Sequence, residues 1–384
     1  MKIDWNAAGK TGLVLSGGGA RGAYQVGVLK AVADMFPMYS QNPFSIITGT
    51  SAGALNAVAI AAAANNFRLS IKKVERIWSD LHVNQVYNAD ALHLLQSVLR
   101  LLLSLLNDGI GRNKPLALLD NSPLRQLLAE SIKLRNIQSR IDKGFLEAVG
   151  ITASAYSTGE SVTFFQANEH VTRWCRAHKV GVPAVICVDH LLASSALPTI
   201  FPAQKVGLEY YGDGALRQIS PVSAALHMGA ERVMVIGVSG ADKAAKTPPA
   251  AEHSPSLAKM VGHVFNSAFL DAMDADLDNL TRINELVGIL QNESPRAPTS
   301  DLKKIDLLRI EPSIAFDQIA EKHVTDLPRS MRAVLRVTGA TQRGGGGSMA
   351  SYLLFEGSFC RELIQHGYAD GLEHEDMIRQ FFGL

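Results

Sequence analysis

Residues 44–64, FSIITGTSAGALNAVAIAAAA, contain the strand, turn and helix on which the predicted fold of this chain depends. The apolar run at residues 44–48 is short, β-branched and bounded by turn residues, and these properties predict a buried strand. The pentapeptide G-T-S-A-G follows at once, and the alanine-rich stretch behind it predicts a helix. A strand, a G-x-S-x-G turn and a helix in this order are typical of a serine nucleophile, because the tight turn lifts the hydroxyl above the sheet.

The serine of this elbow turn (residues 49–53) is Ser51, and Gly49 and Gly53 flank it. So tight a turn leaves almost no room for side chains at the two glycine positions. The next helix would place unpaired N–H groups and a partial positive charge beside the hydroxyl. The alternative is a chance match in a chain with 32 glycines. The flanking strand and helix favour the nucleophile.

A second glycine-rich turn, GGGARG at residues 17–22, lies between a predicted strand at 12–16 and a predicted helix at 23–35. It also matches the G-x-G-x-x-G pattern of dinucleotide-binding proteins, which need an acidic residue at the end of the next strand. Here that strand ends in TGTS at residues 48–51, without an acid. A nucleotide-binding module built on residues 17–22 is nevertheless the alternative from a different functional class.

The other use of such a turn is to present consecutive backbone N–H groups to the oxyanion of an acyl-transfer reaction, with no side chains in the way. In a parallel sheet, the glycine-rich turn and the elbow turn both lie at the carboxyl ends of strands, where ligands bind. The two turns together therefore predict an acyl-transfer site.

The composition excludes several classes of function. The 37 Lys and Arg against 36 Asp and Glu lack the basic excess of a nucleic-acid-binding protein, so we expect no nucleic-acid partner. The three cysteines have no metal spacing and form no disulfide framework, which favours a reducing compartment. Neither a signal peptide nor a run of about 18 apolar residues is present. We expect a globular cytoplasmic protein, at most peripheral to a membrane.

Residues 91–106, ALHLLQSVLRLLLSLL, predict a helix with one narrow polar stripe and leucine over most of its remaining surface. So wide an apolar arc exceeds what contact with a single core covers. Burial on several sides is one explanation. A mobile lid, a homodimer contact or a face that rests on a membrane, formed by the helix from Leu92 to Leu106, are the others.

Four motifs, in this order, resemble the patatin-like phospholipases: GGGARG at 17–22, GTSAG at 49–53, ASSALP at 193–198 and DGA at 213–215. The resemblance covers residues 12–238. It implies hydrolysis of acyl esters of phospholipids or related lipids through a Ser–Asp dyad and an acyl-enzyme, without a catalytic histidine, a metal or another cofactor. The acid of that family is most often followed by two glycines, whereas here it is followed by glycine and alanine.

The resemblance also assigns roles to individual residues. It makes Ser51 the nucleophile and Asp213 its base, and it places in the oxyanion hole Gly17, Gly18, Gly19 and Arg21. An Asp in water, with a pKa near 3.9, is a weak base, but enclosure in an apolar site raises its basicity. Tyr210 and Tyr211 stand next to the motif and could supply such surroundings.

Two alternatives apply to the acid. Asp213 could be a turn residue between glycines, or the first partner of a Ser-Asp-His triad, because histidines such as His227 and His253 follow it in the chain. Neither histidine stands in a context typical of catalysis. A soluble-ester hydrolase or thioesterase is the alternative within the enzymes.

The predicted fold is α/β, with a mostly parallel central sheet and helices on both faces, as in the three-layer sandwich of the family that the chain resembles. We expect a catalytic domain at residues 1–240, with a leucine-rich helical insertion around 85–120. A C-terminal extension of helices and at least one strand, residues 241–384, is expected to pack on it. Further predictions are a hairpin around residues 157–160, a helix at 188–197, strands at 232–238 and 305–310, and loops at 241–256, 292–301 and 343–348.

Overall fold

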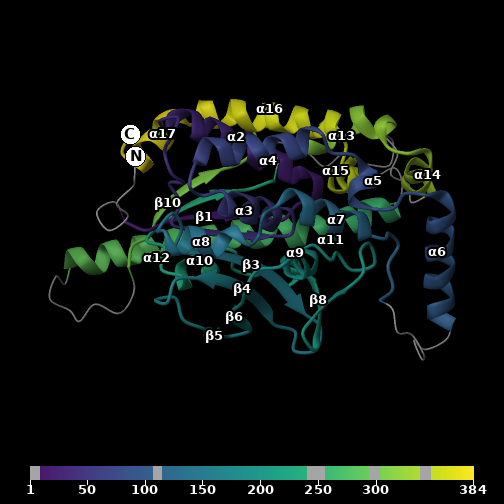
Figure 1. Cartoon of the computed structure of the whole chain (residues 1–384), viewed down its shortest axis with the longest axis horizontal. Coiled ribbons are helices and arrows are strands. Elements are labelled where there is room, and N and C mark those ends of the chain that lie inside the picture. The colour runs from purple at the N-terminus through teal and green to yellow at the C-terminus, as the bar shows by residue number, and fades with distance from the viewer. Residues whose placement is uncertain (1–8, 107–114, 240–255, 294–302, 338–346) are drawn as a thin grey trace.

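The central element is a sheet in which the strands from the first half of the chain lie beside strands from the second half (Figure 1). The computed structural model describes residues 9–106, 115–239, 256–293, 303–337 and 347–384. Within these ranges the sheet has ten strands, in the order β10-β9-β1-β2-β3-β4-β6-β5, with β8 paired to β3 and β7 to β8. The strands are β1 (Thr11–Leu15), β2 (Ile46–Thr50), β3 (Ala148–Ala155), β4 (Ser161–Ala167), β5 (Trp174–Arg176), β6 (Lys179–Pro183), β7 (Gln204–Val206), β8 (Glu209–Asp213), β9 (Arg232–Ile236) and β10 (Asp306–Ile310).

The strands β10, β9, β1, β2 and β3 are parallel to their neighbours, and antiparallel pairing begins where β4 and β8 join β3. The sheet is thus mostly parallel, as predicted. The longer helices are α2 (Gly22–Met35), α3 (Ala52–Ala62), α4 (Phe67–Ser79), α6 (Ala91–Leu106), α7 (Ser122–Ser131), α11 (Leu257–Asn266), α12 (Ala272–Glu293), α13 (Phe316–His323), α14 (Arg329–Val337), α16 (Gly357–Glu373) and α17 (Glu375–Phe382). The shorter ones are α5 (Val83–Val86), α8 (Asn136–Asp142), α9 (Val188–Ser194), α10 (Ser223–His227) and α15 (Gly347–Leu353).

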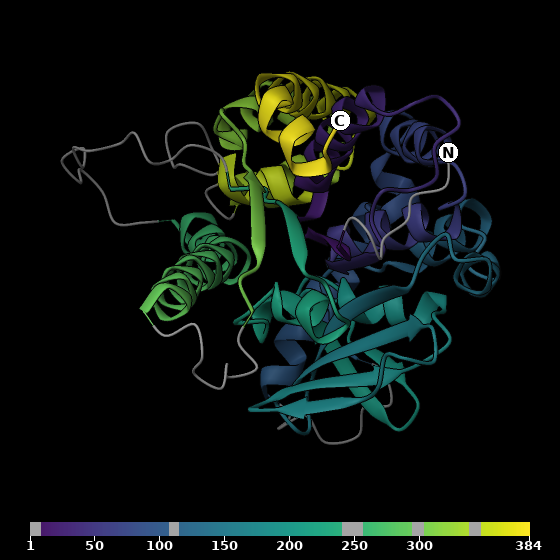
Figure 2. The same ribbon diagram turned by 90° about the vertical axis from the view of Figure 1, so that its left-hand side faces the viewer.

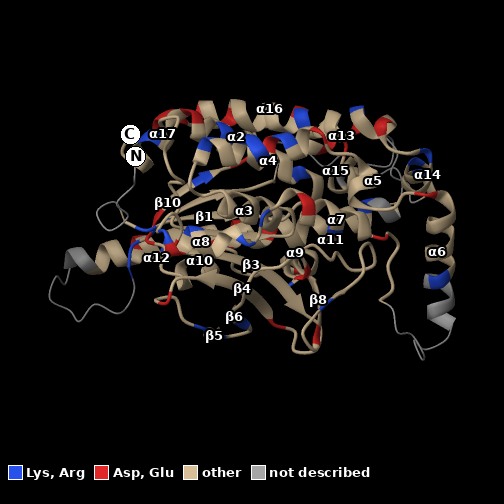
Figure 3. Cartoon of the chain, in the orientation of Figure 1, with Lys and Arg blue, Asp and Glu red and all other residues tan. Residues whose placement is uncertain are grey.

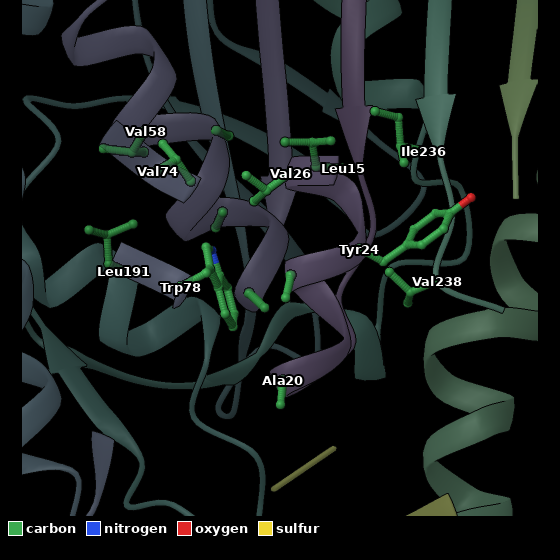
Figure 4. Packing of buried hydrophobic residues seen from close by; sticks show 14 of the residues in the cluster. Leu15, Ala20, Tyr24, Val26, Val58, Val74, Trp78, Leu191, Ile236 and Val238 are labelled. Carbon is green, nitrogen blue, oxygen red and sulfur yellow. The ribbon is translucent and has the colours of Figure 1, made fainter. Parts of the chain in front are cut away.

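Helices cover both faces of the sheet, which confirms the predicted α/β class and its three layers (Figures 1 and 2). Successive side chains of β1 point to opposite faces, as in any strand. Leu13 and Leu15 join the core formed with α2, α3 and α16, whereas Val14 joins the core formed with α10 and α12. Figure 4 shows part of the first core, where Leu15 and Ile236 of neighbouring strands lie near Val26 of α2. Burial on both faces explains why these strands are apolar runs in the sequence.

The predicted elements are found with small shifts. The strand predicted at residues 44–48 is β2, which begins two residues later and extends to Thr50. The predicted hairpin is formed by β3 and β4, and the strand predicted at 305–310 is β10. The loops predicted at 241–256, 292–301 and 343–348 lie almost wholly outside the described residues.

The C-terminal part of the chain belongs to the same layered unit. Strand β10 pairs with β9 along the sheet, and α16 packs lengthwise on α2 (Figure 1). The boundary predicted near residue 240 falls outside the described residues. The residues on its two sides share one sheet and one core.

Helix α6 stands at the edge of the molecule (Figure 1). Of its described side chains, Leu94 is buried, whereas Leu92, Leu95 and Leu99 are 73%, 66% and 55% exposed. Burial on several sides, one of the predicted explanations, is therefore wrong for residues 91–100; the side chains from residue 101 to 106 lie outside the described ones. Among the described helices, none has the length and apolar character needed to cross a membrane.

Candidate active site

Ser51 sits between the end of β2 and the start of α3, in a strained backbone conformation. Its φ is 54° and its ψ is −126°, and it is one of the few residues other than glycine with a positive φ in the described part of the chain. Such a conformation costs about 1–3 kcal/mol and persists only where the surrounding structure enforces it. Its side chain is almost completely buried.

The two glycines of the elbow turn explain how the strain is enforced. A Cβ atom on Gly49 would overlap the carbonyl oxygen of Gly53, and a Cβ on Gly53 would overlap that of Leu15. Only glycine fits at either position, because backbone atoms of the turn and of β1 occupy the space of a side chain. The strand, the turn and the helix can therefore pack at the distance that exposes Ser51 to the end of the sheet.

A serine of α9 holds the elbow turn from the other side. The backbone N–H of Ser51 donates a hydrogen bond of 2.9 Å to Ser194 Oγ, and this hydroxyl donates in turn to the carbonyl oxygen of Thr152 at 2.7 Å. The sequence pattern at residues 193–198 pointed to this helix, but it assigned no contact to Ser194. Two serines in a short small-residue helix were the available signal.

Asp213 ends β8 beside the elbow turn and is fully buried. Its backbone N–H donates to the carbonyl oxygen of Ala196 at 2.8 Å, and its Oδ1 accepts a 3.0 Å hydrogen bond from the N–H of Ala215. Its other oxygen, Oδ2, is buried and has no hydrogen bond of full geometry among the described residues. One oxygen therefore orients the carboxyl group, and the second is left for another partner.

Burial raises the pKa of Asp213 to about 7, although the nearby Ser51 hydroxyl and the Ala215 amide each lower it. The interaction with the hydroxyl shows that the fold brings Ser51 and Asp213 together from positions far apart in the chain. Tyr210, expected to enclose the acid, is instead 40% exposed. A carboxylate with a pKa near 7 is a stronger base than one in water and is still partly ionised at neutral pH.

The glycine-rich turn lies directly beside Ser51. A Cβ atom on Gly17 would approach the Cβ of Ser51 to 3.1 Å. Among the described residues, the backbone N–H groups of Gly18 and Gly19 donate to no carbonyl, and neither does that of Ala52 at the start of α3. Three backbone donors thus remain unpaired around one buried hydroxyl, an arrangement suited to an oxyanion.

The side chain of Arg21 points away from this group. It is almost completely buried, and its Nε donates to Ser351 Oγ at 2.9 Å while its Nη2 pairs with Asp317 Oδ1 at 2.8 Å. The guanidinium also lies 4.1 Å from the centre of the Tyr352 ring. These partners come from the C-terminal part of the chain, where no sequence motif drew attention to them.

An apolar cavity begins at Ser51 and Gly19 and extends between α3, α4 and α7. It encloses about 810 Å³ of empty space, part of it open to solvent. Apart from a few serines and Asn56, its walls are apolar side chains, such as those of Leu55, Val74, Trp78, Leu124, Leu128 and Phe355.

No histidine among the described residues hydrogen-bonds with Ser51 or Asp213. His227 stacks on Trp174, with ring centres 5.2 Å apart, and bonds within its own helix. His253 lies outside the described residues. The described residues also contain no cluster of three or more His, Cys, Asp or Glu side chains suited to a metal ion.

Comparison with known proteins places this geometry in context. The family model of the patatin-like phospholipases matches residues 13–226. No similar sequence was found among curated proteins. The solved structures that are similar include VipD from Legionella pneumophila, with 13% identity over 96% of this chain and 67% of that one and a TM-score of 0.41.

Human GIVD cytosolic phospholipase A2 with a fluorophosphonate inhibitor is similar over 99% of this chain and 60% of that one, with 11% identity and a TM-score of 0.44. The ExoU–SpcU complex of Pseudomonas aeruginosa follows at 16% identity, 85% and 65% coverage and a TM-score of 0.30. The chain thus spans about three fifths to two thirds of these proteins. Likeness at this level says nothing about substrate or partner.

Proposed function

Because the chain belongs to the patatin-like phospholipase family, we propose that it hydrolyses carboxylic esters of phospholipids or related acyl lipids. The observation that carries this proposal is the pairing of Ser51 with a buried Asp213 whose pKa is raised to about 7. An acid and a hydroxyl placed together in this way suit proton transfer during nucleophilic attack. No metal or other cofactor is needed for the steps that follow.

In the proposed mechanism, Ser51 Oγ attacks the ester carbonyl carbon and gives its proton to Asp213 Oδ2, the oxygen without a full hydrogen bond. The negative charge on the former carbonyl oxygen is held by the N–H groups of Gly18, Gly19 and Ala52. The tetrahedral intermediate then expels the alcohol, which takes the proton from Asp213 and leaves an acyl-enzyme on Ser51. Water attacks this ester with Asp213 again as base, and release of the fatty acid restores the serine.

The apolar cavity supports the lipid as substrate rather than a small soluble ester. It begins at the nucleophile, and its walls match an acyl chain in polarity. Removing each CH₂ group of such a chain from water contributes about 0.8 kcal/mol. A long chain therefore gains binding energy that a short ester or a polar thioester lacks.

We further propose that α6 contacts the lipid surface from which the substrate comes. Its exposed leucines have no protein cover, and Figure 3 shows that it carries almost no charge. Arg100 is the sole Lys, Arg, Asp or Glu in residues 91–106, and an arginine suits an anionic headgroup. The alternative occupant is a second copy of the chain. The expected location is the cytoplasmic surface of a membrane.

A lipid panel assayed with the wild type and Ser51→Ala side by side tests the proposal. The wild type should release fatty acid from phospholipids, and a fluorophosphonate probe should label Ser51. Ser51→Ala should lose both properties and keep its melting temperature, because removal of one hydroxyl opens little space. Full activity in the variant, or labelling at another residue, would contradict the assignment. Bound NAD or FAD absorbance in the purified protein would instead favour a nucleotide-binding module.

A further inference from the structure

The glycine-rich turn is enclosed by residues that lie far beyond the part of the chain that matches the family model, which ends at residue 226. A Cβ atom on Gly17 would approach the ring of Phe269 to 2.6 Å, and one on Gly18 would approach Val238 Cγ2 to 2.6 Å. A Cβ on Gly19 would overlap the carbonyl oxygen of Tyr352. The outer wall of the turn is therefore built from residues 238–352.

Arg21 ties the same turn to this wall. It belongs to the 3-10 turn η1 (Gly19–Arg21), and its N–H donates to the carbonyl oxygen of Gly18 at 3.2 Å. Its side chain, 3% exposed, reaches Asp317 at the start of α13 and Ser351 on α15. The rings of Phe316 and Tyr352 flank the guanidinium.

A guanidinium in such surroundings needs its counter-charge. A buried charge that loses its partner is strongly disfavoured, and it moves toward water where the structure permits. Arg21 can do so only by moving η1, which carries the N–H of Gly19 and hydrogen-bonds to Gly18. A displacement of this backbone by a fraction of an ångström would take the proposed donors away from the oxyanion, whose stabilisation depends on their exact placement.

We propose that Asp317 is a positioning residue of the active site, which acts through Arg21 to hold the donors of the glycine-rich turn in place. The inference rests on the proposed function and extends it: part of the catalytic geometry is set by α13 and α15. Asp317 does not touch the substrate. Its carboxylate fixes the guanidinium, the guanidinium fixes η1, and η1 fixes the backbone donors.

The test is the variant Asp317→Asn, which preserves shape and removes the charge. The matched control is Glu362→Gln, because Glu362 also pairs with α13, through Lys322 at 2.9 Å and His323 at 2.7 Å, and neither of these contacts involves the glycine-rich turn. Both variants would be assayed for kcat and KM on a short soluble ester, together with their melting temperatures.

We expect Asp317→Asn to lower kcat about ten- to a hundredfold, somewhat less than deletion of one oxyanion donor, with KM within about twofold of wild type. Glu362→Gln should keep kcat within about twofold, and Asp317→Glu, which restores the charge, should recover most of it. A purely structural role would lower the melting temperature in both charge-removing variants without a selective loss of kcat. Wild-type kcat in Asp317→Asn overturns the inference.

Should Asp317→Asn unfold, the double variant Arg21→Met with Asp317→Asn removes both charges and leaves none unpaired in the core. It should fold and still show the low kcat, because η1 has lost its tie to α13; wild-type kcat in this variant overturns the inference. Failure of the proposed function is recognised separately. In that case the wild type itself hydrolyses no ester and Ser51 takes no fluorophosphonate label.

Discussion

The two glycine-rich turns of the active site have similar sequences and equivalent places at the ends of β1 and β2, yet they are held in different ways. The glycines of the elbow turn press against backbone atoms of Leu15 and of the turn itself. Those of the glycine-rich turn press against Phe269, Val238 and Tyr352. The first turn is a local structure, whereas the second depends on segments more than 200 residues away.

The difference teaches where each function is encoded. A nucleophile needs one strained residue, and a strand, two glycines and a helix suffice to create it. Oxyanion donors must match the position of an atom that belongs to the substrate, so their support has to come from several directions. The following predictions test this contrast, beginning with the largest expected effect.

Asp213→Asn should lower kcat by about ten-thousandfold, because an amide cannot accept the proton of Ser51 and loss of a catalytic partner commonly costs this much. Steady-state kinetics on a soluble ester measure the effect. His227→Ala is the control and should retain activity, since this histidine stacks on Trp174. A comparable loss in the control would replace the dyad with a triad.

The same substitution should stabilise the fold. Burial raises the pKa of Asp213 from 3.8 to about 7, so the unfolded chain is ionised between these values while the folded protein keeps its proton. The wild type therefore loses stability as pH rises from about 4 to 7, and roughly 4 kcal/mol in total is expected for a shift of about three units. Asp213→Asn should lack this loss. Urea unfolding at pH 4 and pH 8 measures it, and equal stabilities at pH 8 would contradict the raised pKa.

Gly18→Ala should impair kcat by up to about 3 kcal/mol, the cost of one oxyanion donor, with a smaller change in KM. The new methyl group would meet the side chain of Val238 rather than backbone. Adding Val238→Ala should therefore recover part of the activity. No such rescue is expected for Gly53→Ala, whose methyl group would meet the backbone of β1. Equal behaviour of the two glycine variants in kinetics and melting temperature would remove the contrast between the turns.

Leu95→Glu combined with Leu99→Glu should weaken binding to anionic liposomes and leave hydrolysis of a short soluble ester nearly unchanged, because both leucines are exposed on α6. Leu208→Glu is a matched control, since Leu208 is fully exposed on a different loop. Liposome sedimentation and light scattering measure lipid binding and mass. A change in oligomeric mass alone would assign α6 to a second copy of the chain.

Much of the candidate site could be predicted from the sequence. The positions of β1, β2, α2 and α3 follow from short apolar runs and the glycines between them. Asp213 was found as the acid of a motif, but its raised pKa was not, because the expected enclosure by Tyr210 is absent and burial comes from the packing of β8 against β3 and α9. The exposure of α6 was one of several open alternatives.

The sequence by itself determined the α/β class and the strand–turn–helix units that hold Ser51 and the glycine-rich turn. Their signals are local, since each glycine or apolar run constrains the backbone within a few residues of itself. Only the tertiary structure decided that Arg21 turns away to Asp317, that Tyr352 and Phe269 close the glycine-rich turn, and that Asp213 becomes a stronger base. Burial and ion pairing add up over groups that are distant in the chain, so no stretch of sequence contains them.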